Sequence, residues 1–537
     1  MMIVDELCKG QANRSISKTR PLSESTMADK ASVLSDSIMA EIAKRASDPE
    51  SCDRWETLVS QANYCRRPVR LKGYIEQVDS KTCRKKLTYS TSQEPDGVLL
   101  KACGSRRETL CSPCSAIYKR DVFQLIKAGL CGGKKVPVSV TNHPSCFVTL
   151  TAPSFGRVHR ANLDGKCNFG VSEKQCVHGN PLSCQKVHRE SDDQVGTPIC
   201  SKCYQYEETI CFNLSVSELW RRTMIYSLRY LGQLVGLSSR EVTKTLRLSY
   251  VKVFEFQKRG AVHIHALVRL DAIDERDRRN LICPPDNIGA DILKLAIERA
   301  ARNVSAPLEL LDNNGQQKRS HWGTQIDIKI VHNKVQHSPT PRADYLDSKV
   351  QHSPTLAARY LAKYSVKSTD SKGLLDHRIR LGDLENSTIS EHLKTLVWTC
   401  WQMGQEPVWE KFNLEAWSHM LGARGHFMTK SRHWSTTLRA IRAERQNYVL
   451  GKPPIANSVE SNCELATVTT NDDCGHETIE DQGHKEKSTL EIKHFVYVGM
   501  GYTTLGDALV VEGKAREYIE RSNATWQARQ DLRELAA

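Results

Sequence analysis

The sequence predicts an α+β protein, with a central antiparallel sheet flanked by helices, Cys-rich zinc-binding segments and a helical C-terminal part. Two apolar, β-branched stretches, 250–256 and 262–270, flank a short turn that contains glycine, as expected of a β-hairpin. Helical periodicity dominates residues 216–246. Two Cys-x-x-Cys pairs, Cys111–Cys114 and Cys200–Cys203, have the spacing of zinc knuckles.

The length, charge and cysteine content narrow the class of protein. A chain of 537 residues exceeds one comfortable core, so we expect several domains. Lys and Arg number 76 against 62 acidic residues, and the net charge of +14 favours a polyanionic partner. Without a long apolar run or an apolar leader, we expect a cytoplasmic protein that does not engage a membrane. In that reducing compartment the 19 cysteines are better metal ligands than disulfide partners.

Composition divides the chain into six segments. We expect a mobile or peripheral segment (1–60), a Cys-rich zinc-binding segment (61–135), the domain with the central sheet (136–370) and its Cys/His-rich insertion (163–211), a helical basic region (371–450), a disordered linker (451–490) and a small apolar patch with a helix (491–537). The heptapeptide KVQHSPT occurs at 334–340 and again at 349–355, which indicates a local duplication within a loop.

Two histidines share one face of the predicted strand 262–270. Side chains alternate along a strand, so His263 and His265 point the same way and can share a metal ion. A hairpin loop of five residues would pair Glu255 with His263 and add its carboxylate to that face, whereas a loop of four would turn it away. The three residues are the predicted ligands of a divalent cation. A His-x-His pattern alone is more often a structural or surface feature.

Two tyrosines lie one turn apart on a predicted helix. The segment 353–367 opens with Ser-Pro, which is typical of an N-cap and first helical residue. Tyr360 and Tyr364 share one face, with Lys363 and Lys367 on or beside it. A phenolate can attack phosphorus and form a covalent intermediate, and because a phenol ordinarily ionises near pH ~10, neighbouring lysines would assist it. Tyrosines at this spacing are also common in an amphipathic core.

Together these segments resemble the HUH superfamily of rolling-circle initiators. Its pattern is His-hydrophobic-His, here 263–265, followed by a helix with one or two tyrosines and a lysine, here 360–367. A closer similarity is to the replication initiators of actinobacterial plasmids and integrative elements. It is carried by FVTLTAPSFG (147–156), FEFQKRGAVHIH (254–265), YLAKYSVK (360–367) and GHFMTKSRHWSTT (425–437). It covers roughly residues 65–450 and the patch near Phe495, and the KVQHSPT duplication departs from it.

The resemblance implies a fold, a reaction and partners. The fold would be an HUH endonuclease domain with a ferredoxin- or RRM-like palm. His263, His265 and Glu255 would hold Mg²⁺ or Mn²⁺ on the scissile phosphate of single-stranded origin DNA. Tyr364 would attack first, leaving a 5′-phosphotyrosine and a 3′-hydroxyl primer, and Tyr360 would take the second transfer. Since the sequence has no GxxxxGK[ST] motif, unwinding would require a host helicase and other replication proteins.

The cysteines predict structural Zn²⁺ in closed tetrahedral sites, although spacing alone does not assign the ligand sets. Cys83 or Cys103 could complete a site with Cys111 and Cys114. The candidate ligands around Cys200 and Cys203 are Cys167, Cys176, His178, Cys184 and His188. By contrast, we expect Cys211, Cys283 and Cys400 to be buried thiols.

Two further segments remain open between alternatives. Lys430, Arg432 and Trp434 suit phosphate contacts and base stacking, but a solvated loop has the same composition. Residues 231–248 fit either a helix-turn-helix or two helices that lead into the next strand; we favour the second. Competing functions are a two-tyrosine HUH transposase, a zinc-dependent DNA-binding regulator without chemistry and, more remotely, a protein-interaction scaffold.

Overall fold

The computed structural model describes residues 36–79, 82–161, 167, 175–311, 315–331, 353–367, 377–385, 387, 389–449 and 489–535. Most of the linker expected at 451–490 and most of the KVQHSPT duplication lie outside these residues. The chain forms two compact units. Unit 1 consists of 1–102 and 486–537, and unit 2 of 103–485.

A helix at 36–46 precedes the labelled elements. These are α2 (Pro49–Gln61), β1 (Val69–Asp79), β2 (Lys85–Ser90), β3 (Leu99–Lys101), α3 (Ser112–Cys131), β4 (Ser145–Leu150), α4 (Tyr206–Leu234), α5 (Ser239–Thr245), β5 (Leu246–Phe256), β6 (Val262–Ala272), α6 (Ala290–Asn303), β7 (Ser305–Leu311), β8 (Gln317–His321), β9 (Ile326–Ile330), α8 (Pro354–Tyr364), α9 (Leu381–Glu385), α10 (Glu391–Gly404), β10 (Met428–Lys430), α11 (Leu438–Val449), β11 (Thr489–Met500) and α12 (Leu505–Leu535).

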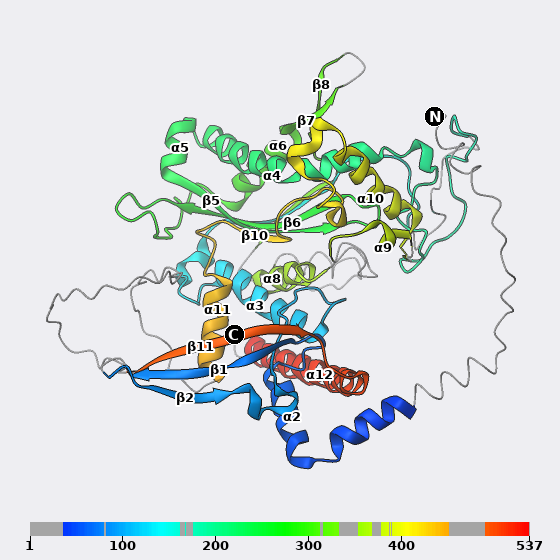
Figure 1. The fold of residues 1–537 in the computed structure, drawn as a ribbon. Coiled ribbons are helices and arrows are strands. Elements are labelled where there is room, and N and C mark those ends of the chain that lie inside the picture. The colour runs from blue at the N-terminus through cyan, green and yellow to red at the C-terminus, as the bar shows by residue number, and fades with distance from the viewer. Residues whose placement is uncertain are drawn as a thin grey trace, which may run out of the picture. The chain divides into compact units, whose positions relative to one another are not determined.

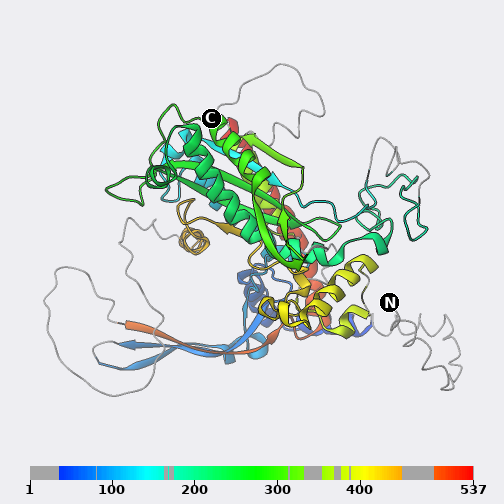
Figure 2. The ribbon, with the colours of Figure 1, turned by 90° about the horizontal axis from the view of Figure 1, so that it is seen from above.

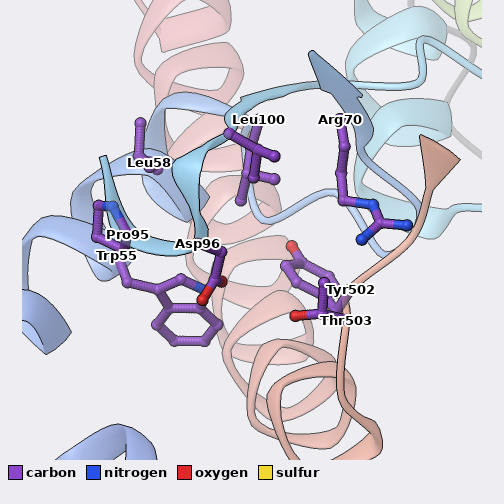
Figure 3. Close-up of a pocket in the computed structure, with 9 residues that line it drawn as sticks. Trp55, Leu58, Arg70, Pro95, Asp96, Leu100, Tyr502 and Thr503 are labelled. Atoms are coloured by element: carbon purple, nitrogen blue, oxygen red, sulfur yellow. The ribbon is translucent and has the colours of Figure 1, made fainter. Parts of the chain in front are cut away.

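Unit 1 joins sequence from both ends of the chain. Strand β1 pairs antiparallel with β11, β2 and β3, and its register with β11 runs from Val69↔Met500 to Asp79↔Thr489. Beside the sheet, the Trp55 ring of α2 meets Tyr502 edge to face, with ring centroids 6.2 Å apart. These two aromatic side chains line a small pocket together with Asp96 and Arg70 (Figure 3).

Unit 2 is built on a five-stranded sheet in the order β10-β5-β6-β4-β9, with every neighbouring pair antiparallel. Helices α4 and α6 cover one face, and α8 contacts β5 and β6 from the other (Figure 1). The α+β prediction with a central antiparallel sheet is therefore confirmed. The segment between β4 and α4 extends away from the sheet near the beginning of α4 (Figure 2).

The central strand β6 has the expected two-sided character. Val262, Ile264, Ala266 and Val268 are fully buried and belong to the core formed with α4 and α6. Burying a side chain as large as valine or isoleucine stabilises a fold by about 1.5–3 kcal/mol. This apolar face fixes the rotation of β6 about its axis, so His263, His265 and the other alternate side chains point to the opposite face of the sheet, which α8 contacts in part.

The division into two units cuts across two of the expected segments. The Cys-rich segment expected at 61–135 is divided between the two units after residue 102, and the expected C-terminal segment 491–537 belongs with residues from the N-terminal part. Residues 231–248 comprise the end of α4, α5 and the start of β5, as favoured over a helix-turn-helix. Among the described residues, no helix combines the length and apolar character needed to cross a membrane.

Candidate active site on the central sheet

The hairpin of β5 and β6 brings Glu255 beside the two histidines. Glu255 pairs directly with His263, and Phe256 pairs with Val262, which leaves a loop of five residues. In that loop Gly260 has φ +79°, a conformation that favours glycine, and its amide donates to the Gln257 carbonyl at 2.8 Å. The register required to place the carboxylate on the histidine face is therefore the one observed.

Two threonines of strand β4 and its continuation hold the histidine rings. The Thr149 hydroxyl lies 3.3 Å from Nδ1 of His265, and the Thr151 hydroxyl lies 3.1 Å from Nδ1 of His263. The imidazole centroids are 4.6 Å apart. With Nδ1 of each ring engaged by a hydroxyl, Nε2 is the nitrogen left for a ligand.

Both tyrosines of helix α8 contact the His265 ring. Ala357, Ala358 and Leu361 are fully buried and anchor one side of the helix. The Tyr364 ring lies 4.5 Å from the His265 ring, centroid to centroid, and the Tyr360 ring lies 5.6 Å from it. The two phenols are joined by a hydrogen bond of 2.9 Å from Tyr364 to Tyr360.

A carboxylate and an ammonium link the helix to the histidines. Lys367 Nζ donates to Glu255 Oε1, while Glu255 Oε2 lies 3.6 Å from His265 Nε2. Burial alone would raise the pKa of Glu255, but the hydrogen bonds from His265 and Lys367 outweigh burial and lower it. Lys367 Nζ also lies 4.4 Å from the centre of the Tyr364 ring. The other predicted lysine, Lys363, is exposed on the same helix.

His263 is held as a neutral base. Burial, with a smaller contribution from His265, lowers its pKa to about 3. At physiological pH the ring therefore keeps a lone pair on one nitrogen, which is the state that binds a metal ion. The arrangement offers two imidazole nitrogens and one carboxylate on a single face, opposite two phenols.

Arg106 supports the C-terminal end of α8. Its guanidinium donates to the carbonyl of Lys367 at 2.8 Å and to that of Ser365 at 3.3 Å. It also stacks on Phe427, with Cζ 3.6 Å from the ring centre. A cation at this end satisfies carbonyls that have no partner within the helix and complements the helix dipole. Arg106 thereby fixes the residues that follow Tyr364.

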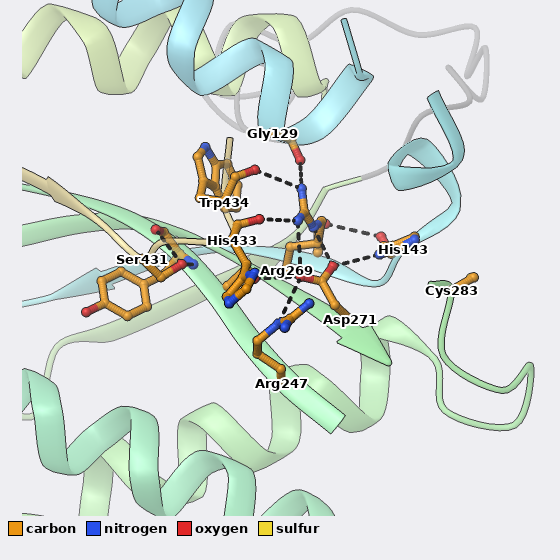
Figure 4. Close-up of polar contacts among 12 residues, drawn as sticks. Gly129, His143, Arg247, Arg269, Asp271, Cys283, Ser431, His433 and Trp434 are labelled. Carbon is orange, nitrogen blue, oxygen red and sulfur yellow. Dashed lines mark hydrogen bonds and ion pairs between the residues drawn. The ribbon is translucent and has the colours of Figure 1, made fainter. Parts of the chain in front are cut away.

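The structure corrects the expected DNA-stacking role of Trp434. This side chain is fully buried and packs on Gly129 of α3, where an added Cβ would lie 2.3 Å from the indole. Arg269, also fully buried, lies 5.4 Å from the ring and donates to the Trp434 carbonyl at 3.2 Å (Figure 4). Arg269 forms a two-point contact with Asp271, whose carboxylate also meets His143 at 2.7 Å. The basic residues near Trp434 in the sequence suggested a DNA contact, but the indole belongs to the core.

The other two predicted DNA contacts differ from each other. Lys430 is half-buried on β10, and its ammonium donates to the carbonyls of Ser435 at 2.8 Å and Ser431 at 3.3 Å. It therefore holds the 431–435 turn together. Arg432 is exposed at the tip of that turn and is free to meet a phosphate.

Three groups of potential metal ligands form among the described residues of the chain. Cys103, Cys111 and Cys114 come together, as expected for the first knuckle. The remaining two groups lie in the segment before α4 and consist of His159, Cys167, Cys184 and His188, and of Cys176, His178, Cys200 and Cys203. Cys83 is in none of the three groups and is exposed. Cys211 and Cys400 are buried as expected, but Cys283 is exposed.

Sequence reasoning missed Thr149, Thr151 and Arg106. The threonines carried a usable signal, because they alternate with Val148 and Leu150 and so share one face of their strand. Arg106 had none, since more than 250 residues separate it from the carbonyls that it binds.

Comparison with known proteins identifies relatives of this chain. The family model described as "Replication initiator protein, pSAM2" matches residues 51–516. A replication initiator protein of Streptomyces ambofaciens is 34% identical over 419 residues, which cover 78% of this chain and 84% of that protein. No solved structure matches it.

Proposed function

Because this chain belongs to the family of replication initiator proteins described by that of pSAM2, we propose that it nicks and rejoins single-stranded origin DNA through a tyrosine. The observation that carries the proposal is the contact of the Tyr364 ring with the His265 ring, 4.5 Å between centroids, with Tyr364 hydrogen-bonded to Tyr360. The two phenols proposed as nucleophiles thus lie against an imidazole proposed to bind the activating cation. The five-stranded sheet would be the palm of an HUH-type nuclease.

The proposed first step is an exchange of phosphate esters. The Tyr364 oxygen forms a bond to phosphorus as the bond from phosphorus to the 3′ oxygen breaks. The phenol loses its proton to solvent or base, and the leaving 3′ oxygen gains one, so the products are a 5′-phosphotyrosine and a free 3′-hydroxyl. The bond energy is retained for rejoining. Tyr360 then attacks a second phosphodiester in the same way, and the 3′-hydroxyl that this cleavage frees attacks the Tyr364 phosphotyrosine, which rejoins the first strand and releases the Tyr364 oxygen.

Residues of the chain would hold a divalent cation for this step. His263, His265 and Glu255 supply two neutral nitrogens and a carboxylate, a donor set that suits Mn²⁺ and is acceptable to Mg²⁺. Their fit is supported by the threonine hydroxyls on the two Nδ1 atoms and by the 3.6 Å between His265 Nε2 and Glu255 Oε2. When bound, the cation would polarise a phosphoryl oxygen.

Lys367 would act in two ways. It lies over the Tyr364 ring, so its charge favours the phenolate form of the nucleophile. It also pairs with Glu255, where it offsets the carboxylate charge. Substrate and cation would therefore enter a site whose anionic group already has a positive partner.

The test is incubation of the purified chain with labelled single-stranded origin DNA and Mn²⁺. We expect a covalent protein–DNA adduct that is absent from the Tyr360→Phe/Tyr364→Phe double variant. Binding of the same DNA should survive in that variant, because neither change removes a charge. If wild-type protein binds the origin but forms no adduct, the chain is a DNA-binding initiator without strand-cleaving chemistry.

The two-tyrosine transposase remains a second candidate, because it would use the same site. Family membership favours initiation. The two roles separate by substrate: an initiator cleaves an origin hairpin in preference to the ends of a mobile element.

A further inference from the structure

Among residues 175–199 of the segment between β4 and α4, all of which the structure describes, no apolar side chain is buried. Two of the valines there are exposed, with 95% of Val177 and 64% of Val187 accessible to solvent. The buried side chains at its centre include Cys167, His188 and Cys200. A small segment without apolar burial needs another source of stability, and a cluster of cysteine and histidine indicates metal ions.

Eight Cys and His side chains here form two sets of four. The first quartet consists of His159, Cys167, Cys184 and His188, and the second of Cys176, His178, Cys200 and Cys203. Within each quartet all four ligand atoms lie within 4.8 Å of one another. From these contacts we infer that the segment binds two Zn²⁺ ions in an interleaved arrangement.

Distances in the first quartet match tetrahedral zinc. Zn–S and Zn–N bonds of about 2.3 and 2.0–2.1 Å put sulfur and nitrogen ligands about 3.6 Å apart. Cys184 Sγ lies 3.4 Å from His188 Nε2, and Cys167 Sγ lies 3.9 Å from His159 Nδ1. The opposite nitrogen of His188 meets the Asp192 carboxylate at 2.5 Å. A carboxylate on the remote nitrogen is the usual outer partner of a zinc-binding histidine.

The second quartet has the same features with one more sulfur. His178 Nδ1 lies 3.3 Å from Cys203 Sγ and 3.9 Å from Cys200 Sγ. Asn180 donates to Cys200 Sγ at 3.1 Å, a hydrogen bond that stabilises a thiolate. Gly179, at φ +77°, lets the chain turn back so that its amide donates to the Cys176 carbonyl at 2.8 Å. This is the tight turn of a zinc knuckle.

The order of ligands along the chain makes the two sites interdependent. They occur as four successive pairs: the first and third pairs form the first quartet, and the second and fourth pairs form the second. Each metal ion thus closes a loop that contains a ligand pair of the other ion. A segment built in this way gains from both cross-links, because each shortens the loop that the other must order.

The segment that carries the two quartets contacts the hairpin of β5 and β6. Gly196, which follows the first quartet, packs so closely on Lys258 that an added Cβ would lie 2.6 Å from its backbone. The Tyr204 hydroxyl, next to Cys203, donates to the Arg259 carbonyl at 3.1 Å. Lys258 and Arg259 belong to the five-residue loop between Phe256 and Val262. The zinc segment therefore supports the turn that sets the register of the candidate active site.

Counting zinc in double variants tests the pairing. Interleaving predicts that Cys167→Ser/Cys184→Ser loses one zinc per chain relative to wild type, whereas Cys167→Ser/Cys176→Ser loses two. Pairing of neighbours in sequence predicts the reverse. Cys283→Ser, at an exposed cysteine outside every group, should leave the zinc content unchanged. Any metal held by Cys103, Cys111 and Cys114 is common to all variants and cancels.

A second measurement avoids the risk that a variant fails to fold. Cadmium-113 exchanged into the wild-type chain should give one resonance typical of two sulfur ligands and another typical of three, besides any resonance from Cys103, Cys111 and Cys114. This spectrum tests whether the segment holds two metal ions, while the double variants test how the ligands pair. Wild-type protein that retains no zinc in this segment after dialysis, or a loss pattern that follows sequential pairing, would overturn the inference. Because zinc content is measured without DNA, this result is independent of the proposed nicking activity.

Discussion

The Tyr364 hydroxyl donates a 2.9 Å hydrogen bond to that of Tyr360, so the two candidate nucleophiles are in contact before any substrate arrives. The pair is asymmetric. Tyr364 lies closer to His265 and beneath the Lys367 ammonium, whereas Tyr360 meets the Phe147 ring edge to face at 5.7 Å. We expect this asymmetry to set the order of the two transfers.

Removing each phenol oxygen separately tests that order. Tyr364→Phe should lower the rate of the first nick by about 10³-fold or more, since the nucleophile itself is lost. Tyr360→Phe should leave the first nick within about tenfold of wild type but abolish the second transfer. The measurement is single-turnover adduct formation, followed by addition of a second labelled strand. Equal loss of the first nick in both variants would contradict a fixed order.

Substitution of Lys367 should separate cation binding from chemistry. In Lys367→Met the carboxylate of Glu255 loses its ammonium partner, so we expect Mn²⁺ to bind about tenfold more tightly. The rate of nicking at saturating Mn²⁺ should nevertheless fall by about tenfold or more, because the charge over Tyr364 is gone. Titration of activity with Mn²⁺ measures both. Lys363→Met, exposed on the same helix, is the matched control and should change neither.

Arg106 is expected to be a positioning residue, because it contacts the backbone after Tyr364 and not the reacting groups. Arg106→Ala should lower kcat by about tenfold through misplacement of the phenol, with little change in the KM for DNA. Arg106→Lys should recover only part of kcat, since an ammonium cannot form the same pair of directed bonds. A rise in KM with unchanged kcat would instead place Arg106 in DNA binding.

Substitution of Trp434 should affect the stability of the fold, whereas substitution of Arg432 should affect DNA binding. Trp434→Ala removes a fully buried indole and should cost about 3–5 kcal/mol of unfolding free energy. Arg432→Ala, at an exposed position, should leave stability within about 0.5 kcal/mol but weaken DNA binding and flatten its dependence on salt. Denaturant unfolding and salt-dependent binding assays measure the two effects. Unchanged stability in Trp434→Ala would refute the buried position of the indole.

The burial of Lys252 should make the unfolding free energy depend on pH. The residue is 7% exposed on β5, and burial lowers its pKa from the usual 10.5 to about 8. Between these two values the unfolded chain binds more protons than the folded chain, so this group makes unfolding free energy rise with pH. At pH 7 Lys252→Met should therefore be more stable than wild type, by at most about 3 kcal/mol.

The difference between these two proteins should shrink as pH rises through 8 toward 10.5. Thermal melting of both at pH 7 and pH 10 provides the measurement. Because every other titrating group is common to the pair, a gap that stays constant over this range would mean that Lys252 is not deprotonated in the folded state.

Local patterns predicted the local parts of the candidate site. The alternation in β6 and the loop of five residues were enough to put Glu255 and His263 opposite each other. The Ser353-Pro354 start and the spacing of Tyr360 and Tyr364 were enough to define α8. In each case the decisive interactions lie within a few residues along the chain or across a short hairpin, where periodicity and turn length determine geometry.

Features that depend on distant contacts could not be predicted in this way. Trp434 looked like a surface aromatic because its neighbours are basic, and only the position of Gly129 on α3 makes room for the indole. The ligand quartets were left open for the same reason: spacing shows which residues can bind zinc, but folding decides which of them meet. The pairing of β1 with β11 had no signal within either strand.

That pairing bears on how the polypeptide folds as it leaves the ribosome. The amide of Gln77 and the hydroxyl of Thr489, 412 positions apart, form a hydrogen bond across β1 and β11. The strand β11 therefore cannot join the sheet of unit 1 until residues 489–500 have been synthesised, whereas the described strands and helices of unit 2 end at residue 449. During that interval the edge of β1 that later pairs with β11 is open, and an open strand edge is the kind of surface on which aggregation begins.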